Sequence, residues 1–195
     1  MKKIESTGIV LDADNIDTDQ IIPAKFLKST SREGFGEHLF SNWRYLENGE
    51  ANTDFALYNY PSDAAILISG NNFGCGSSRE HAAWAISDYG IRAVISSQFA
   101  DIFKGNALNN DIIPIVLSTD EITAIMRYVE QHPSAKINID IDKQSVQIEE
   151  EGFSFFQTFQ IDQLKKKFIM EDIKDLEYML SIKEEIAQFE LAHIL

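Results

Sequence analysis

Residues 64–97 read AAILISGNNFGCGSSREHAAWAISDYGIRAVISS, and this stretch decides the fold class. AAILIS is a short apolar run with β-branched residues that ends at a glycine, which is typical of a buried strand, and IRAVISS is a second run of this kind. Between them, Ser77 and Glu80 have the spacing of a capping box, and Gly90 is a typical helix stop. We therefore expect a helix over about 78–89. A strand, a helix and a strand joined by short connections predict a parallel pair in an α/β fold.

The pattern continues toward the carboxyl end. FADIFKGNALNN is typical of a short helix, and DIIPIVL of a third buried strand. Ser118 and Glu121 repeat the capping-box spacing ahead of ITAIMRYVEQ, and Pro133 closes that helix. Alternating apolar residues over 136–150 and 153–159 predict strands joined by a turn, and IDQLKKKFIM and KEEIAQFE predict C-terminal helices.

Toward the amino end the signals are weaker. IVLDADNIDTDQIIPAKFLK at 9–28 predicts a strand that enters an acidic loop. Residues 32–60 are rich in glycine, asparagine and aromatic residues but show little periodicity. We expect irregular surface structure there, in which a binding loop could lie.

Length and composition set limits on the class of protein. A chain of 195 residues fits one domain, because single cores usually run to roughly 100–200 residues. We expect a core over about 1–160 and a helical extension over about 161–195. No apolar run reaches the roughly 20 residues needed to span a bilayer. The expectation is therefore a cytoplasmic protein without a membrane partner.

Charge and cysteine content exclude two further classes. The formal net charge of −14 argues against nucleic acid as a partner, since phosphate binding needs clustered lysine and arginine. Any anion site must then be a local positive pocket. Cys75 is the only cysteine, so the chain cannot form an internal disulfide or supply the cysteine ligands of an iron-sulfur cluster.

The glycine-rich loop at 70–81 has the features of such a local anion site. It follows a buried strand and precedes a helix, which is a preferred ligand position in α/β sheets. Gly74 and Gly76 let backbone amides approach a bound group, and a helix N-terminus favours negative charge. Arg79 adds a planar cation suited to a carboxylate.

Two common nucleotide-binding patterns do not fit this loop. A P-loop needs lysine before serine or threonine, whereas Gly76 precedes Ser77 directly. The dinucleotide fingerprint needs glycine where Arg79 stands, and it needs an acidic residue near Ser96 that the chain lacks. A nucleotide module is the alternative to a carboxylate substrate, which fits the residues better.

Several motifs carry a resemblance to a known family. NFGCGSSREHAAWAISDYG is similar to the signature loop of the aconitase swivel-domain family, and with Cys75 and Trp84 it looks most like the isopropylmalate dehydratase small-subunit branch. DADNIDTDQIIPAKFLK, FGEHLFSNWRYLENGEANTDFAL and FADIFKGNALNNDIIPI resemble the same family in order and spacing. Nearly the whole chain is covered. The resemblance implies an α/β swivelling β/β/α domain with a parallel βαβ core, additional strands and C-terminal helices.

The resemblance also implies roles for three loop residues. Ser77 would be the general base, acting as an alkoxide that the helix N-terminus and Arg79 stabilise. Ser78 and Arg79 would bind a substrate carboxylate. The alternative from the bare sequence is that Ser77 only caps the helix, which is worth about 1 kcal/mol. Arg79 would otherwise be a solvated first-turn residue.

Other residues would support the site. The family suggests that Asp19 lies near an active site shared with a second subunit. A cation for the other substrate carboxylate would be Lys28 or Arg32, between which the sequence does not decide. His81 is expected to orient neighbours rather than to do chemistry. The remaining supporting positions are Gly74 and Gly76.

Two alternatives concern single residues. Cys75 beside His81 could be a nucleophile, since a helix N-terminus lowers a thiol pKa, although a small loop residue fits as well. Asp17 and Asp19 could ligate a metal or orient a histidine, or could simply form a turn. We expect no metal site in this chain, and Glu80 is best explained by capping.

The implied function is that of a hydro-lyase in leucine biosynthesis, which converts 2-isopropylmalate reversibly to 3-isopropylmalate by dehydration and rehydration. A 4Fe-4S cluster on a separate large subunit would assist departure of the hydroxyl, so this chain would be inactive alone. The alternatives are the small subunit of a related hydro-lyase, of homoaconitase or methylmalate/citraconate type, and a non-catalytic carboxylate-binding subunit.

Two further expectations concern specificity and the tail. Nothing in the glycine-rich loop would recognise an isopropyl group, so we expect residues 28–36 to close over the substrate side chain. The family usually has glycines near Asp172 and Glu177, which this chain lacks, so the resemblance does not predict the local turn geometry near the C-terminus.

Overall fold

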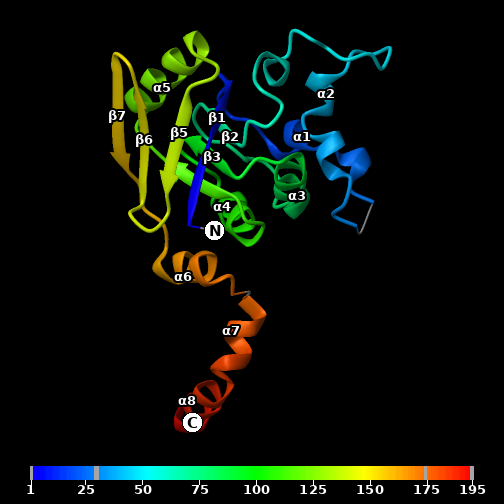
Figure 1. The fold of residues 1–195 in the computed structure, drawn as a ribbon. Coiled ribbons are helices and arrows are strands. Elements are labelled where there is room, and N and C mark those ends of the chain that lie inside the picture. The colour runs from blue at the N-terminus through cyan, green and yellow to red at the C-terminus, as the bar shows by residue number, and fades with distance from the viewer. Residues whose placement is uncertain (1, 29–30, 174, 194–195) are drawn as a thin grey trace.

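A seven-stranded sheet forms the body of the protein, in the order β4-β3-β2-β1-β5-β6-β7 (Figure 1). The computed structural model describes residues 2–28, 31–173 and 175–193. The strands are β1 (Lys3–Leu11), β2 (Ile66–Ser69), β3 (Ala93–Ser96), β4 (Ile113–Val116), β5 (Lys136–Asp140), β6 (Ser145–Glu150) and β7 (Phe153–Thr158). Strands β1 to β4 pair in parallel, whereas β5, β6 and β7 are antiparallel neighbours. The predicted parallel strands and later strands are thus confirmed.

Strand β1 joins the two halves of the sheet. Its residues 3–7 pair antiparallel with β5, and its residues 8–11 pair parallel with β2. The sequence prediction placed the strand only from Ile9 and so missed its first half. That half, KIEST, is too polar to read as a buried strand, but pairing with β5 fixes it in the sheet.

Helices cover both faces of the parallel half. Helices α3 (Glu80–Tyr89) and α4 (Asp101–Asn109) pack on one face, and α5 (Thr119–Gln131) packs on the other. Because successive strand residues point to opposite faces, each strand contributes to two cores. Leu67 belongs to the core under α3 and α4, and its neighbours Ile66 and Ile68 belong to the core under α5.

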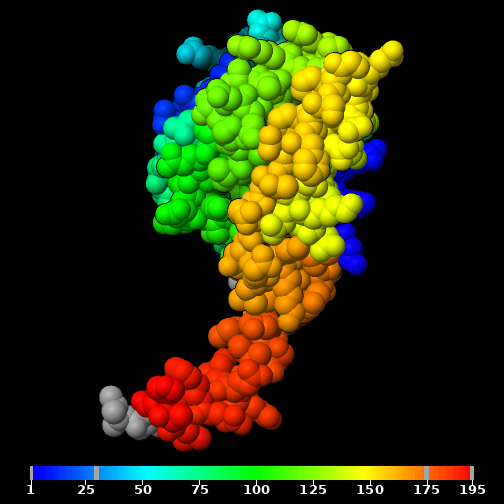
Figure 2. All heavy atoms as spheres, turned by 90° about the vertical axis from the view of Figure 1, so that its left-hand side faces the viewer, coloured from blue at the N-terminus to red at the C-terminus, as the bar shows by residue number. Residues whose placement is uncertain are grey.

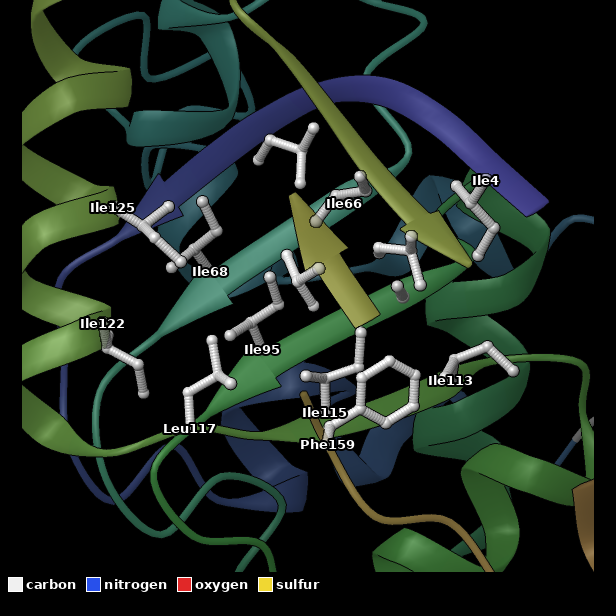
Figure 3. Close-up of a cluster of buried hydrophobic side chains, with 14 of the residues drawn as sticks. Ile4, Ile66, Ile68, Ile95, Ile113, Ile115, Leu117, Ile122, Ile125 and Phe159 are labelled. Atoms are coloured by element: carbon white, nitrogen blue, oxygen red, sulfur yellow. The ribbon is translucent and has the colours of Figure 1, made fainter. Parts of the chain in front are cut away.

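The core on the α5 side is mostly isoleucine. Figure 3 shows Ile66, Ile68 and Ile95 from the parallel strands facing Ile122 and Ile125 of α5. Strands β5 to β7 curl over this layer. β-branched side chains suit a pleated surface that is buried on both faces, and the short apolar runs of the sequence reflect that burial.

The segment between β1 and β2 corrects a prediction. We expected irregular surface structure over 32–60, but it forms short helices whose apolar side chains enter the core. These are the 3-10 helices η2 (Phe35–His38) and η3 (Ala56–Asn59) and the one-turn helix α2 (Ser41–Arg44). Phe35, Leu39, Phe40 and Leu57 are buried. Single turns have no amphipathic period, so the sequence pattern could not reveal this burial.

The predicted C-terminal helices are present as α6 (Gln163–Glu171), α7 (Asp175–Ser181) and α8 (Lys183–His193). Helices α7 and α8 project away from the body as an arm (Figures 1 and 2). Asp172 ends α6 with a left-handed backbone (φ 56°), a conformation that favours glycine. The chain therefore keeps a glycine-like turn at this position without the glycine. Across the described ranges, no helix combines the length and apolar character required to cross a bilayer.

Candidate active site at the start of helix α3

The loop between β2 and α3 lies at the carboxyl end of the parallel strands, and its backbone requires glycine at two positions. Gly74 (φ 76°) and Gly76 (φ 89°) both adopt left-handed conformations. A Cβ at Gly74 would also lie 2.2 Å from the Phe103 ring, so no other residue fits there. The two turns bring the loop residues after Gly76 to the surface at the beginning of α3.

The start of α3 differs from the prediction. The helix begins at Glu80 rather than at Ser78, and its N-cap is Arg79, which makes no side-chain capping bond. The predicted Ser77–Glu80 capping box is therefore wrong. The Ser77 amide instead donates to the hydroxyl oxygen of Thr18 (3.2 Å), which holds Ser77 outside the helix.

Glu80 has a different partner from the one expected. Its carboxylate accepts a hydrogen bond from the Asn110 side-chain amide (3.1 Å) and forms an ion pair with Arg32 (3.5 Å). The Asn110 hydrogen bond, with a smaller contribution from Arg32, lowers the pKa of Glu80 below its ordinary value of 4.5, although partial burial opposes the shift. Glu80 thus joins α3 to the end of α4.

A cavity of about 270 Å³ lies beside the loop. It is lined by Gly74, Gly76, Ser77, Ser78, Ala100, Asp101 and Ile102. Ser77 and Ser78 are exposed, and no described residue exchanges a hydrogen bond with the Ser77 hydroxyl. The predicted loop residues therefore come together around one opening, with an unengaged hydroxyl on its wall.

The cavity lies at the beginning of two helices. Helix α4 begins at Asp101 after the N-cap Ala100, and neither this helix nor α3 has a side-chain cap. The first backbone amides of an uncapped helix lack intrahelical partners and carry partial positive charge. The carboxylate of Asp101 adds negative charge to the lining. Even so, open amides at two helix starts suit a small carboxylate.

Arg79 and Asp19 form an ion pair; neither residue lines the cavity, but Arg79 directly follows the lining residue Ser78 in the chain. The Arg79 side chain is 23% exposed and that of Asp19 is 54% exposed, so the pair lies at the boundary with solvent. An arginine fork can bind a second carboxylate while it keeps its acidic partner. The expectation that Asp19 supports the site fits this placement.

The adjacent Asp17 is occupied with local structure. It is the N-cap of the one-turn helix α1 (Thr18–Ile21), where its side chain accepts from the Gln20 amide in a full capping box. Helix α1 packs beside α3 (Figure 1). In the ranges that the structure describes, no three histidine, cysteine, aspartate or glutamate side chains are grouped so that they could hold a metal ion.

The other predicted residues are not part of the cavity lining. His81 packs against the rings of Phe35 (5.6 Å) and Trp84 (4.5 Å), consistent with an orienting rather than a chemical position. Arg32 lies over the Trp84 ring at 5.0 Å and pairs with Glu80. Lys28 is exposed. The structure thus brings the glycines and serines together, and it places the two candidate second cations elsewhere.

Cys75 is poorly suited to act as a nucleophile. Burial, and then the negative charge of Asp17, raise the pKa of its thiol above the ordinary value of 9.0. The thiol also donates to the carbonyl oxygen of Asn15 (3.4 Å). Because the thiolate is the reactive form, a raised pKa opposes the nucleophile alternative.

Sequence reasoning missed two groups of residues at the site. Residues 100–102, the N-cap and first two residues of α4, line the cavity, and Thr18 holds the Ser77 backbone. The first group could have been found, because the carboxyl ends of neighbouring parallel strands meet at one edge of a sheet. Nothing in the local pattern around Thr18 indicates its contact with Ser77.

Comparisons with known proteins identify the family of this chain. The aconitase C-terminal domain family matches residues 1–120. The 3-isopropylmalate dehydratase small subunit of Christiangramia forsetii is 49% identical over 96% of this chain and 90% of its own length. The chain belongs to this small-subunit family. The protein of that name from Halalkalibacterium halodurans is 44% identical over 100% of this chain and 98% of its own length.

A solved structure extends the comparison to the fold. The crystal structure of 3-isopropylmalate dehydratase from Methanocaldococcus jannaschii matches with a TM-score of 0.66 and 28% identity, and it covers 95% of this chain and 98% of that one. The small-subunit family and its α/β fold, both expected from the loop motifs, are thereby confirmed.

Proposed function

We propose that this chain is the small subunit of a 3-isopropylmalate dehydratase and forms part of a hydro-lyase of leucine biosynthesis. The reaction would be the reversible conversion of 2-isopropylmalate to 3-isopropylmalate by loss and re-addition of water. The observation that carries the proposal is the exposed Ser77 hydroxyl, which no described residue bonds, on a cavity at two uncapped helix starts. Near-full-length similarity to named small subunits supports it.

Ser77 is the proposed general base. Its alkoxide would take the proton from the carbon next to a substrate carboxylate and would return it in the reverse direction. A serine alkoxide needs stabilisation, which the uncapped amides of α3 and the guanidinium of Arg79 can supply.

The substrate carboxylate is proposed to bind between Ser78 and Arg79. Ser78 lines the cavity and would donate its hydroxyl, and Arg79 would give the paired contact typical of guanidinium and carboxylate. Asp19 would keep the guanidinium in place through its ion pair. Gly74 and Gly76 provide the backbone turns, and His81 packs behind the site without a chemical role.

The iron-sulfur cluster is proposed to belong to the partner large subunit. Such clusters need several cysteine thiolates, and this chain has only Cys75, so its donor set does not fit the group. Held by the partner, the cluster would supply Lewis acid assistance to departure of the hydroxyl. The chain's own contributions are then proton transfer and carboxylate binding.

Several expectations remain predictions. Lys28 or Arg32 would serve as the second carboxylate cation only if the loop at 28–36 closes toward Ser77 in the assembled enzyme. Residues 29 and 30 of that loop lie outside the described residues. The sequence is also the basis for two further proposals. The chain would be a single swivel-type domain, with a core over about 1–160 and a helical extension over about 161–195, and it would be cytoplasmic.

Reconstitution tests the proposal. The purified chain, the large subunit loaded with its cluster, and their mixture are each assayed for formation of isopropylmaleate and 3-isopropylmalate from 2-isopropylmalate. Only the mixture should be active, and the chain alone should contain no stoichiometric iron. Activity in the mixture with a methyl-substituted malate or a homocitrate-type substrate, but not with 2-isopropylmalate, would indicate a related hydro-lyase instead. Activity or a 4Fe-4S spectrum in the isolated chain would contradict the division of roles.

A further inference from the structure

Three consecutive residues of the acidic segment (9–28) contact three alternate residues of the glycine-rich loop (70–81) that carries the proposed base. Asp17 forms a parallel β-bridge with Cys75, Thr18 bonds Ser77, and Asp19 pairs with Arg79. The Thr18 amide also donates to the Cys75 carbonyl (2.9 Å). Residues 17–19 therefore hold the glycine-rich loop in position.

Thr18 makes the contact that is closest to the proposed base. Its hydroxyl accepts from the Ser77 amide (3.2 Å) and donates to the Ser77 carbonyl (3.1 Å), so one side chain satisfies both backbone groups of the same residue. Thr18 is only 1% exposed, and it is the first residue of α1, so its position is set by packing and by the Asp17 cap. A buried hydroxyl with two bonds cannot reorient freely.

The Ser77 side chain depends on this contact. Its hydroxyl has no hydrogen-bond partner among the described residues, and the preceding residue is Gly76 (φ 89°), which has no side chain to restrict the backbone. With no side-chain bond and no helix to fix it, the direction of the Ser77 Cα–Cβ bond follows from its backbone. Thr18 bonds both the amide and the carbonyl of that backbone, and the Arg79 amide also donates to the Ser77 carbonyl (2.8 Å).

We propose that Thr18 is a positioning residue for Ser77, which aims the base at the cavity through the backbone without touching the substrate. The inference rests on the proposed function of Ser77 and deepens it. Thr18 would act on the proton-transfer step and not on carboxylate binding, because the Arg79 guanidinium is held separately by Asp19. A small displacement of a catalytic group can lower the rate about a hundredfold.

Two substitutions separate the hydroxyl from the shape of the side chain. Thr18→Val keeps the branched shape and removes both hydrogen bonds, whereas Thr18→Ser keeps the hydroxyl and removes a methyl group. In the reconstituted complex, Thr18→Val should lower kcat about ten- to hundredfold with little change in KM, and Thr18→Ser should keep most of the wild-type kcat.

A matched control uses a second buried hydroxyl, which joins the end of β2 to the chain just after β1. Ser69 donates to the carbonyl of Ala13 (3.2 Å) and is fully buried, but it does not touch Ser77. Ser69→Ala should leave kcat within about twofold of wild type. If Thr18→Val does not fold, Thr18→Cys replaces it, because a thiol is a weak donor and acceptor of similar size; its kcat should fall below that of Thr18→Ser.

The outcomes distinguish this inference from the function on which it rests. A wild-type complex without turnover would overturn the proposed function. A wild-type complex that turns over while Thr18→Val, or Thr18→Cys in its place, keeps the same kcat would overturn only the role of Thr18. A rise in KM with unchanged kcat would do so as well, since it would assign Thr18 to substrate binding.

Discussion

Near the start of both α3 and α5, a serine is followed three residues later by a glutamate, but the two helices begin in different ways. Before α5, the Ser118 side chain accepts from the Glu121 amide (3.3 Å), and the Glu121 carboxylate accepts from the Ser118 amide (2.7 Å). Before α3, Ser77 makes neither bond, and the helix begins at Glu80. The same serine–glutamate spacing thus forms a capping box at the start of α5 but leaves the first amides of α3 without a side-chain cap.

The difference follows from what each helix start faces. Helix α5 begins on the side of the sheet opposite to α3 and α4, and its capping box satisfies amides that would otherwise lack partners. Helices α3 and α4 begin at the cavity, and both leave their first amides without a side-chain cap. A helix start without a side-chain cap is less stable, but its free backbone amides can bind an anion.

The largest effect is expected from Ser77→Ala. Loss of a general base should lower kcat of the reconstituted complex by about 10²- to 10⁴-fold, with a small change in KM. Ser97→Ala is the matched control, since that hydroxyl lies near the same sheet edge but bonds Asn71 (3.2 Å) and does not line the cavity. Equal turnover in the two variants would return Ser77 to a structural role.

Arg79→Lys should act mainly on binding. Lysine keeps the charge but loses the paired geometry, so KM for the substrate should rise about tenfold or more. Arg92→Lys serves as the control, because Arg92 donates to the Ser87 carbonyl (3.0 Å) away from the cavity. An unchanged KM for Arg79→Lys would remove this residue from the carboxylate site.

Ser118→Ala tests the capping box at the start of α5. Removal of a working N-cap should lower the free energy of unfolding by about 1 kcal/mol. Turnover of the reconstituted complex should not change, because α5 lies on the other face of the sheet from α3. Urea denaturation of the isolated chain measures the first effect. A variant as stable as wild type would show that the capping box contributes nothing.

Glu80→Gln should have the smallest effect, and that effect should depend on pH. The lowered pKa of Glu80 means that its carboxylate stabilises the fold above its ordinary pKa of 4.5, and that this stability is lost as the pH falls through the lowered value. Its side chain is 42% exposed, so a few tenths of a kcal/mol are expected. The stability difference from wild type should therefore shrink between about pH 6 and about pH 3. A difference that stays constant would assign the effect to something other than this charge.

Much of the fold could be predicted because its signals are local. The apolar runs at β2, β3 and β4, the stop at Gly90 and the cap at Ser118 depend on neighbouring residues only. The first half of β1 could not be found this way, because its polar residues are held by β5, more than a hundred residues away along the chain.

The site was predicted in part for the same reason. Gly74, Gly76, Ser77 and Ser78 lie in one loop and line one cavity, whereas the roles given to them remain proposals. The capping prediction for Ser77 was wrong because its backbone partner, Thr18, is 59 residues away. Ser77 belongs to both a capping-box spacing and a glycine-rich loop, and its contact with the distant Thr18 determines the backbone that it adopts.

The Ser77 hydroxyl, which no described residue bonds, is proposed to stay free of structural contacts so that it can move a proton. The most direct test is the free energy of unfolding of Ser77→Ala, measured on the same purified chain that is used for turnover. The free energy of unfolding should stay within about 0.5 kcal/mol of wild type, together with the large loss of kcat. A loss of about 1 kcal/mol, as expected for Ser118→Ala, with kcat unchanged would contradict it.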